Sequence, residues 1–221
     1  MNLIRRYAIA IVFALTGLII AALLYPELPA RVPVHWSAAG VVDHWMPKSE
    51  GAFIQPITTL AVIGLLIAVE RREWRGQDTG AMHWLYPAIV AAVAGFMFYV
   101  TILMLFAGMG SHLNIPTDIT VGIGILFAAL GNNLGKVPPN RIVGIRLPRT
   151  LSNREVWSRT HRVAGWLFTL GGLTTVVFAL TTRSPAGAMF GVIVLTASAL
   201  VASAYSFMLS RRLPRDGTSG D

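Results

Sequence analysis

Two histidines and an aspartate, His35, Asp43 and His44, lie close together in a proline-rich segment between two apolar runs. Imidazole and carboxylate groups ligate Zn²⁺ at ~2.0–2.2 Å, so the cluster raises the question of a metal site. His35 and His44 would be the weak candidate ligands, and a further ligand such as His112 would have to come from elsewhere. We expect no metal here. We favour hydrogen bonds from His35 and Asp43 that hold the segment, with contact to an external ligand as the alternative.

A second group of polar side chains lies between the fourth and fifth apolar runs. Its mixture of amide, guanidinium, hydroxyl and imidazole groups could build a polar cluster beneath the helices. Such a cluster either binds a ligand or ties its segment down, and the residue types leave both readings open. The candidate residues are Asn132, Asn140, Arg146, Trp157, Thr160 and His161.

Enzyme chemistry finds little support in the sequence. The chain contains no cysteine, which excludes disulfides, thiolate catalysis and cysteine metal sites. The HExxH, GxSxG and P-loop motifs are missing from the sequence. We therefore expect a protein that is not an enzyme and needs no cofactor. Metal-assisted hydrolysis through His35, Asp43 and His44 is the least favoured of three functional hypotheses.

The composition indicates a membrane protein. Of 221 residues, 54% are hydrophobic and 13% are charged, and apolar runs of about twenty residues recur. A helix of that length crosses a ~30 Å hydrocarbon layer. Six such runs fit, and the expected fold is therefore an all-α integral membrane protein with six transmembrane helices. The expected spans are Tyr7–Leu24, Phe53–Val69, Trp84–Met109, Thr117–Leu134, Val163–Thr181 and Ala188–Leu209.

The distribution of basic residues predicts the orientation. Fifteen of the 18 lysines and arginines lie in the N-terminus, the second and fourth connections and the C-terminal tail. By the positive-inside rule both termini and these connections face the cytoplasm. The net charge of +8 then belongs to segments that meet anionic lipid headgroups, so we expect no nucleic-acid binding. The chain is therefore predicted to be a multi-pass membrane protein with both termini in the cytoplasm.

The predicted span interiors contain no Asp, Glu, Lys or Arg, which argues against a pump or an ion-coupled transporter. Small residues do recur at helix-packing spacing. We expect routine packing within one bundle, and homodimerisation stays open as the alternative. The pairs are Ala91 with Gly95, Gly131 with Gly135, Gly187 with Gly191, and Ala199 with Ser203.

The outward connection, residues 26–52, is expected to form a small hairpin. Val32–Trp36 and Val41–Trp45 are short extended runs on either side of Ser37–Gly40, a connection that ends in glycine. A lone hairpin is marginal in water. We therefore expect Trp36 and Trp45 to anchor it against helix ends or headgroups, and both are candidate ligand-binding residues.

The register of this hairpin decides which side chains meet. If Trp36 pairs with Val41, then His35 and His44 share one face of the hairpin. Asp43 would point to the opposite face, because successive strand residues alternate. This register gives two imidazoles on one face and no triad.

The inward connection, residues 135–162, is expected to begin irregularly and to end as a helix. The segment Val143–Arg146 lies between prolines and should be extended or tightly turned. Ser152 and Glu155 have the spacing of a capping box that starts an interfacial helix. On that helix we expect a buried stripe of Val156, Trp157, Thr160, Val163 and Ala164, with Arg154, Ser158, His161 and Arg162 on the other side.

A long pattern of specific residues runs through the inward connection and the helix ends on either side of it: Gly131, Asn132, Lys136, Pro139, Asn140, Gly144, Ile145, Arg146, Pro148, Thr150, Leu151, Ser152, Trp157, Thr160, His161, Arg162 and Gly165. A second pattern lies in the outward connection: Leu28, Pro29, Val32, Pro33, His35, Trp36, Gly40, Asp43 and Lys48. With the first pattern the chain resembles the SdpI family of bacterial membrane immunity proteins, and the second is similar to the N-terminal segment of unknown function that accompanies the family, so the resemblance covers nearly the whole length. It implies a location in the bacterial cytoplasmic membrane. One departure is Arg149, where the family generally has tryptophan.

The resemblance implies protection of a bacterial cell against a secreted toxic peptide recognised at the membrane, with a signalling role as a further implication. It also implies one polytopic domain over residues 1–221. We divide it into an N-terminal segment, 1–69, and an SdpI-like four-helix part, 84–209. A transporter or channel for a peptide or lipid-like substrate is the alternative function.

Overall fold

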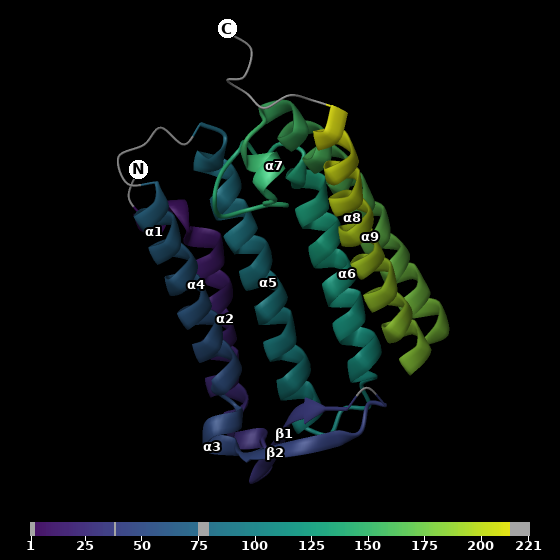
Figure 1. Cartoon of the computed structure of the whole chain (residues 1–221). Helices are drawn as coiled ribbons and strands as arrows, with labels where there is room; N and C mark the ends of the chain where they lie inside the picture. The colour runs from purple at the N-terminus through teal and green to yellow at the C-terminus, as the bar shows by residue number, and fades with distance from the viewer. Residues whose placement is uncertain (1–2, 38, 75–79, 213–221) are drawn as a thin grey trace, which may run out of the picture.

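The computed structural model describes residues 3–37, 39–74 and 80–212. It is mostly helical, with one small hairpin after the first long helix, as the sequence predicts (Figure 1). Six of its helices are long and apolar enough to cross a membrane: α2, α4, α5, α6, α8 and α9. In chain order the elements are α1 (Leu3–Arg6), α2 (Ala8–Leu24), a 3-10 turn (Tyr25–Glu27), β1 (Arg31–Trp36), β2 (Val42–Pro47), α3 (Lys48–Gly51), α4 (Ile54–Glu73), α5 (Met82–Gly108), α6 (Ile115–Leu134), α7 (Pro148–Leu151), α8 (Arg154–Thr182) and α9 (Pro185–Arg212).

The long helices form two groups of three. Helices α2, α4 and α5 pack on one another, and α6, α8 and α9 form the second group, with α5 against α6 joining them (Figure 1). At one end the groups share a buried cluster in which Val137 and Trp157 of the second group meet Tyr7, Met82 and Leu85 of the first. At the other end the hairpin lies across the helix ends.

Glycines let the second group pack closely. A Cβ atom added at Gly172 of α8 would lie 2.4 Å from the carbonyl oxygen of Gly124 in α6. About two turns further along α6, a Cβ at Gly131 would lie 2.8 Å from the carbonyl oxygen of Gly165. The two helix backbones are therefore in direct contact, which only glycine permits at these positions. Gly131, one of the small residues noted in the sequence, thus serves packing within the bundle.

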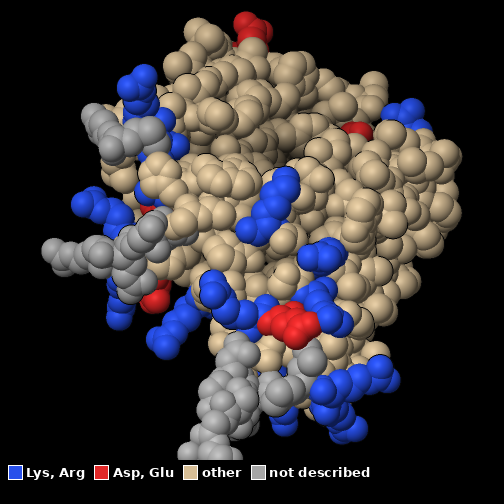
Figure 2. All heavy atoms as spheres, turned by 90° about the horizontal axis from the view of Figure 1, so that it is seen from above, with Lys and Arg blue, Asp and Glu red and all other residues tan. Residues whose placement is uncertain are grey.

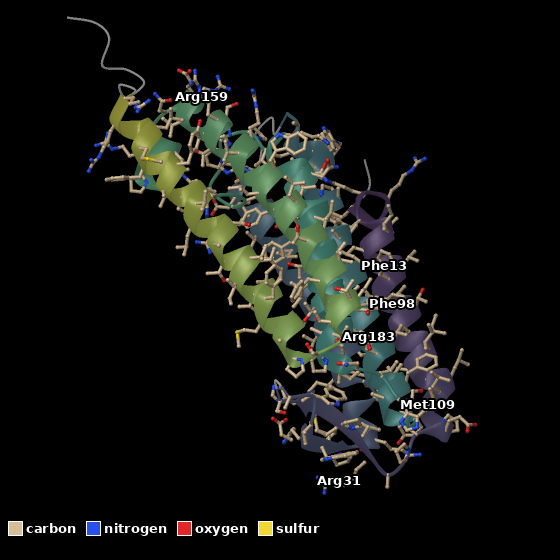
Figure 3. The ribbon with its side chains drawn as sticks, turned by 90° about the vertical axis from the view of Figure 1, so that its right-hand side faces the viewer. Phe13, Arg31, Phe98, Met109, Arg159 and Arg183 are labelled. Atoms are coloured by element: carbon tan, nitrogen blue, oxygen red, sulfur yellow. The ribbon has the colours of Figure 1, made fainter. Side chains whose placement is uncertain are left out.

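Basic side chains gather at the end opposite the hairpin. Arg159 lies at that end and Arg31 at the hairpin end (Figure 3). Viewed end-on, the surface carries many Lys and Arg side chains with few acidic ones between them (Figure 2). The exposed basic residues of the segments at this end are Arg5, Arg71, Arg72, Lys136, Arg141, Arg146, Arg149, Arg154, Arg159, Arg162, Arg211 and Arg212.

The end of α4 differs from the prediction. Helix α4 continues past Val69 to Glu73, so Glu70 lies within a spanning helix and not beyond its end. Its carboxylate is buried there by partners from α1 and the start of α2, which the sequence pattern does not reveal. Helix α8 runs from Arg154 to Thr182 without a break, so the predicted interfacial helix continues directly into the fifth span.

Candidate functional site

The hairpin is built by an antiparallel pair of strands, with Arg31 opposite Pro47 and Trp36 opposite Val42. Its turn is closed by a hydrogen bond from the Ser37 amide to the Val41 carbonyl, at 2.8 Å. Gly40 has a φ of +81°, a conformation that favours glycine at the end of this connection. Ala38, within the predicted connection, lies outside the described residues.

The predicted hairpin register is wrong by one residue. Trp36 lies opposite Val42 instead of Val41, and His35 lies opposite His44. The pairs Arg31 with Pro47 and Trp36 with Val42, on either side of the irregular pairing at His35, share the shifted register, which brings Asp43 level with His35. As a result the His35 Nδ1 lies 2.6 Å from the Asp43 Oδ1. His35 and Asp43 thus make the hydrogen bond that the favoured interpretation required.

A metal site does not assemble at the hairpin. Within the described part of the chain, no three His, Asp or Glu side chains lie close enough together to hold a metal ion. The His35 and Asp43 side chains are exposed and bonded to each other.

Val32 packs the hairpin against the helix ends. Val32 is 3% exposed and packs against the end of α5, where a Cβ on Gly108 would lie 3.3 Å from its Cγ1. Trp45, predicted as an anchor, is 45% exposed. Lys48 adds a polar tie through its Nζ, which donates to the carbonyl of Leu28 at 3.2 Å. Trp45 therefore does not pack against the helix ends, and its contact with lipid headgroups stays a prediction.

Trp36 faces a cavity beneath the hairpin. This cavity has a volume of about 410 Å³ and lies between the hairpin and the ends of α4, α5, α6 and α9. The hairpin reaches across it, since the Gly40 turn packs against Pro116 at the start of α6. Its lining is mainly apolar, with His35, Trp36, Ser37, Gln55 and Thr120 as the residues that carry polar groups. A volume of ~300–1,000 Å³ with a few polar groups is typical of a ligand site.

At the basic end, Asn140 organises the segment between α6 and α7. Its side-chain oxygen accepts from the amides of Ile142 and Val143, at 2.8 and 2.7 Å. Its side-chain nitrogen donates to the carbonyls of Pro138 and Val143, at 2.8 and 3.1 Å. Asn140 therefore replaces the hydrogen bonds that regular secondary structure would supply, and it holds the tight turn predicted there.

His161 and Trp157 hold the same segment from α8. The indole Nε1 of Trp157 donates to the Val137 carbonyl at 2.7 Å, and its ring stacks on His161 with 4.0 Å between centroids. The Nε2 of His161 accepts from the Ile145 amide at 3.0 Å. Its Nδ1 lies 2.8 Å from the Trp157 carbonyl, so Nδ1 carries the proton. This imidazole is a structural acceptor.

The predicted placement of His161 on the polar side of α8 is wrong. His161 is fully buried with Thr160 and Trp157, because the preceding segment folds back over this side of the helix. Gly144 permits that approach with a φ of +118°, and a Cβ there would lie 2.1 Å from the His161 Nε2. Only glycine fits this position.

The remaining candidates of the basic end do not join this hydrogen-bond network. Asn132 is exposed, whereas the Thr160 side chain is fully buried and its hydroxyl lacks a hydrogen-bond partner. The exposed Arg146 donates to the Arg141 carbonyl within its own segment. The structure therefore brings together Asn140, Trp157 and His161 as a framework.

The start of α8 corrects the predicted capping box. Asn153, not Ser152, caps the helix, and its side chain accepts from the Val156 amide at 2.8 Å. Glu155 pairs with Arg159 one turn later instead of reaching back. An asparagine next to the serine offers an equally good cap, so the spacing alone misplaced the helix start by one residue.

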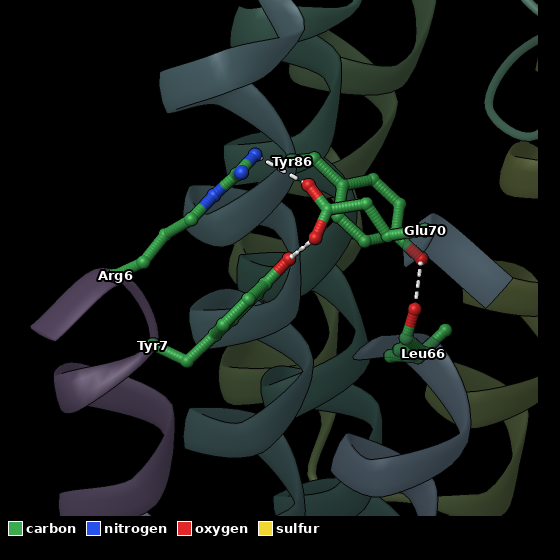
Figure 4. Close-up of polar contacts among 5 residues, drawn as sticks. All are labelled: Arg6, Tyr7, Leu66, Glu70 and Tyr86. Atoms are coloured by element: carbon green, nitrogen blue, oxygen red, sulfur yellow. Dashed lines mark hydrogen bonds and ion pairs between the residues drawn. The ribbon is translucent and has the colours of Figure 1, made fainter. Parts of the chain in front are cut away.

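Sequence reasoning missed a buried carboxylate at the basic end. Glu70 of α4 is 5% exposed and accepts from the Arg6 guanidinium and from the Tyr7 hydroxyl (Figure 4). Tyr86 of α5 lies beside it and donates to the Leu66 carbonyl at 2.9 Å. Burial, and next the hydrogen bond to Glu70, raise the pKa of the Tyr7 phenol, which therefore stays a donor. An acidic residue directly after an apolar run was the available signal.

Comparisons with known proteins bear on both ends of the molecule. Residues 136–206 match the SdpI/YfhL protein family, and residues 12–60 match a domain of unknown function, DUF1648. The chain is 24% identical over 181 residues to the immunity protein SdpI of Bacillus subtilis (strain 168), covering 80% of this chain and 83% of that protein. No solved structure matches the chain.

Each matched region includes one of the two ends already described, together with long helices that run between them. The first includes the hairpin, and the second includes the segment held by Asn140, together with α8 and most of α9. The chain therefore carries an SdpI/YfhL family region over residues 136–206 and a DUF1648 segment at its N-terminal side, and it is a distant homologue of the Bacillus immunity protein SdpI.

Proposed function

We propose that this chain is a membrane immunity protein that protects a bacterial cell by recognising a toxic peptide at the hairpin end. The observation that carries the proposal is the cavity beneath the hairpin, in a chain that is a distant homologue of an immunity protein. The cavity volume of about 410 Å³ suits one or two large apolar side chains. His35, Trp36 and Gln55 line it and can fix the orientation of a bound peptide.

The orientation is part of the proposal. The basic end would face the cytoplasm of a bacterial cell membrane, with both termini there, because lysine and arginine are retained on that side. The hairpin and its cavity would then face outward, where a secreted peptide arrives. Anionic lipids would contact the exposed arginines of the basic end.

The protein would act by binding and not by catalysis. The polar residues of the basic end hold the chain itself, since Asn140 and His161 direct their polar atoms at backbone groups. At the hairpin, His35 and Asp43 engage each other. Neither arrangement presents an activated nucleophile next to a base.

The test uses two alanines of the same helix. Ala188 lines the cavity, whereas Ala186 is exposed and lies outside its lining. A sensitive Bacillus strain that lacks its own immunity protein receives the wild type, Ala188→Phe or Ala186→Phe, and survival under the toxic peptide is counted. We expect protection by the wild type and by Ala186→Phe, and loss of protection with Ala188→Phe because the ring fills the cavity. Absence of protection by correctly inserted wild-type protein would contradict the proposal.

A second candidate function is transport of a peptide or lipid-like substrate. The observation that favours it is the position of the cavity between two separate groups of helices. Substrate flux in proteoliposomes tests it. Flux that Ala188→Phe blocks and Ala186→Phe spares would support transport, and no flux above empty vesicles would eliminate it.

A further inference from the structure

Two neighbouring cavities form one trough along α5, on the side where it faces α2. The first has a volume of about 290 Å³ and is lined by Arg6, His83 and Trp84 among others. The second has a volume of about 410 Å³ and lies between α2, α5 and α6. Ala91 lines both cavities, so they adjoin at that residue. Neither shares a lining residue with the cavity beneath the hairpin.

The two ends of the trough differ in chemistry. At the basic end it carries the Arg6 guanidinium, the Tyr7 phenol and the exposed side chains of His83 and Trp84. Beyond Ala91 its lining contains no charged residue. Tryptophan with 52% of its surface exposed, next to cationic groups, is typical of the headgroup level of a membrane. A ligand with one polar end and one apolar end would fit.

The length of the apolar part matches one leaflet. From Ala88 to Tyr99 the trough follows α5 for eleven residues, which is roughly 16 Å at ~1.5 Å per residue. Half of a ~30 Å hydrocarbon layer is about 15 Å. The trough is therefore long enough to hold an acyl chain from the headgroup level to the middle of the membrane.

The charge around the polar end selects the headgroup. The Glu70 carboxylate is occupied by Arg6, and Arg5, Arg71 and Arg72 are exposed in the adjoining parts of α1 and α4. The other acidic residue at this end of α4, Glu73, is exposed. The three arginines therefore outnumber it. The local excess of positive charge favours an anionic ligand.

We propose that this trough binds one anionic phospholipid from the leaflet at the basic end. Its headgroup lies beside Arg6 and His83, and one acyl chain follows α5 past Ala91 towards Tyr99. The small side chains Ala88, Ala91, Ala92 and Gly95 form the floor of the trough and make room for the chain.

A second copy of the protein is the competing occupant, because Ala91 and Gly95 have the spacing of a helix-packing pair. Such pairs associate through flat faces that let backbones touch. Here the ring of Phe13 stands over Gly95, with its Cε2 3.2 Å from the position of an added Cβ. This wall makes the surface concave, which suits a thin flexible chain better than a helix.

The test is photo-crosslinking in vesicles of phosphatidylcholine that contain phosphatidylglycerol with a photoactivatable group in its acyl chain. Crosslinked residues of the wild-type protein are identified by mass spectrometry. We expect crosslinks between Ala88 and Tyr99 to exceed those around exposed Ala61 of α4 several-fold, and unlabelled phosphatidylglycerol to compete where phosphatidylcholine does not. An even distribution without competition would mean that ordinary surrounding lipid is all that contacts α5, and the proposal would be wrong.

Variants add a second measurement. Ala91→Phe fills the trough and should remove the competed crosslinks, whereas Ala61→Phe on the open face of α4 should retain them. Protein–protein crosslinks through the trough that Ala91→Phe abolishes would overturn the proposal in favour of a dimer. If Ala91→Phe fails to insert, the competition between the two lipids on the wild type decides the question alone. None of these measurements depends on the toxic peptide.

Discussion

At the scale of single residues, the buried Glu70 carboxylate holds α1 and the start of α2 against α4. It joins Arg6 and Tyr7 to α4, so three segments depend on one side chain (Figure 4). The Arg6 side chain is 18% exposed. If Glu70 loses its negative charge, the positive charge of Arg6 stays partly buried without an opposite charge beside it. Glu73 in the same helix is exposed.

We predict that Glu70→Gln lowers the free energy of unfolding by about 2 kcal/mol, the size of one hydrogen bond to a charged group. Glu73→Gln should change it by less than about 0.5 kcal/mol, as an exposed substitution does. Thermal unfolding of the purified protein in detergent measures both. Equal losses for the two variants would show that Glu70 carries no special stabilisation.

The residues of the site were predictable in kind and less so in arrangement. Asn140, Trp157 and His161 stood out by their residue types, and the structure places all three around one segment. That His161 is an acceptor for Ile145 depends on the left-handed backbone of Gly144, which no periodic pattern reveals. Glu70 was missed because its burial comes from chain segments far away in sequence.

At the scale of elements, the contact of α6 with α8 depends on glycine. Added Cβ atoms at Gly124 and Gly172 would approach opposing backbone atoms within 3 Å, and a backbone cannot move aside as a flexible side chain can. Gly64 of α4 has nothing within 4 Å of such an atom. Gly172 and Gly64 therefore provide a matched pair, because the same substitution at either position changes the helix propensity by the same amount.

We predict that Gly172→Val lowers the unfolding free energy by roughly 3 kcal/mol or more through overpacking. Gly64→Val should leave it within about 1 kcal/mol, since the added side chain meets lipid or solvent. Folded yield and thermal unfolding in detergent compare them. A Gly172→Val protein as stable as Gly64→Val would refute the close contact.

The elements themselves followed closely from the sequence. Six apolar runs predicted six long helices because length and composition suffice to recognise them. The hairpin was predicted from its glycine and prolines, but its register was wrong because it is fixed by the turn, which the Ser37 amide closes onto the Val41 carbonyl. The start of α8 lies one residue later than predicted because Asn153, and not Ser152, caps the helix.

At the scale of the whole molecule, the absence of cysteine from the sequence makes the proposed orientation directly testable. Ala39→Cys places a thiol at the hairpin turn, and Ser158→Cys places one at the exposed basic end. We predict that a membrane-impermeant maleimide applied to intact cells labels Ala39→Cys, and that Ser158→Cys reacts only after the membrane is opened. The reverse pattern would invert the orientation and move the hairpin cavity to the cytoplasmic side.

The glycine seam between α6 and α8 has a mechanical consequence. Helices α6 and α8, whose backbones touch at two levels, cannot slide or tilt against each other without a steric clash. The pair therefore moves as one rigid unit. A ligand bound under the hairpin would then shift the two groups of helices relative to each other at the contact of α5 with α6 and at the buried cluster of the basic end, and not within the pair of α6 and α8.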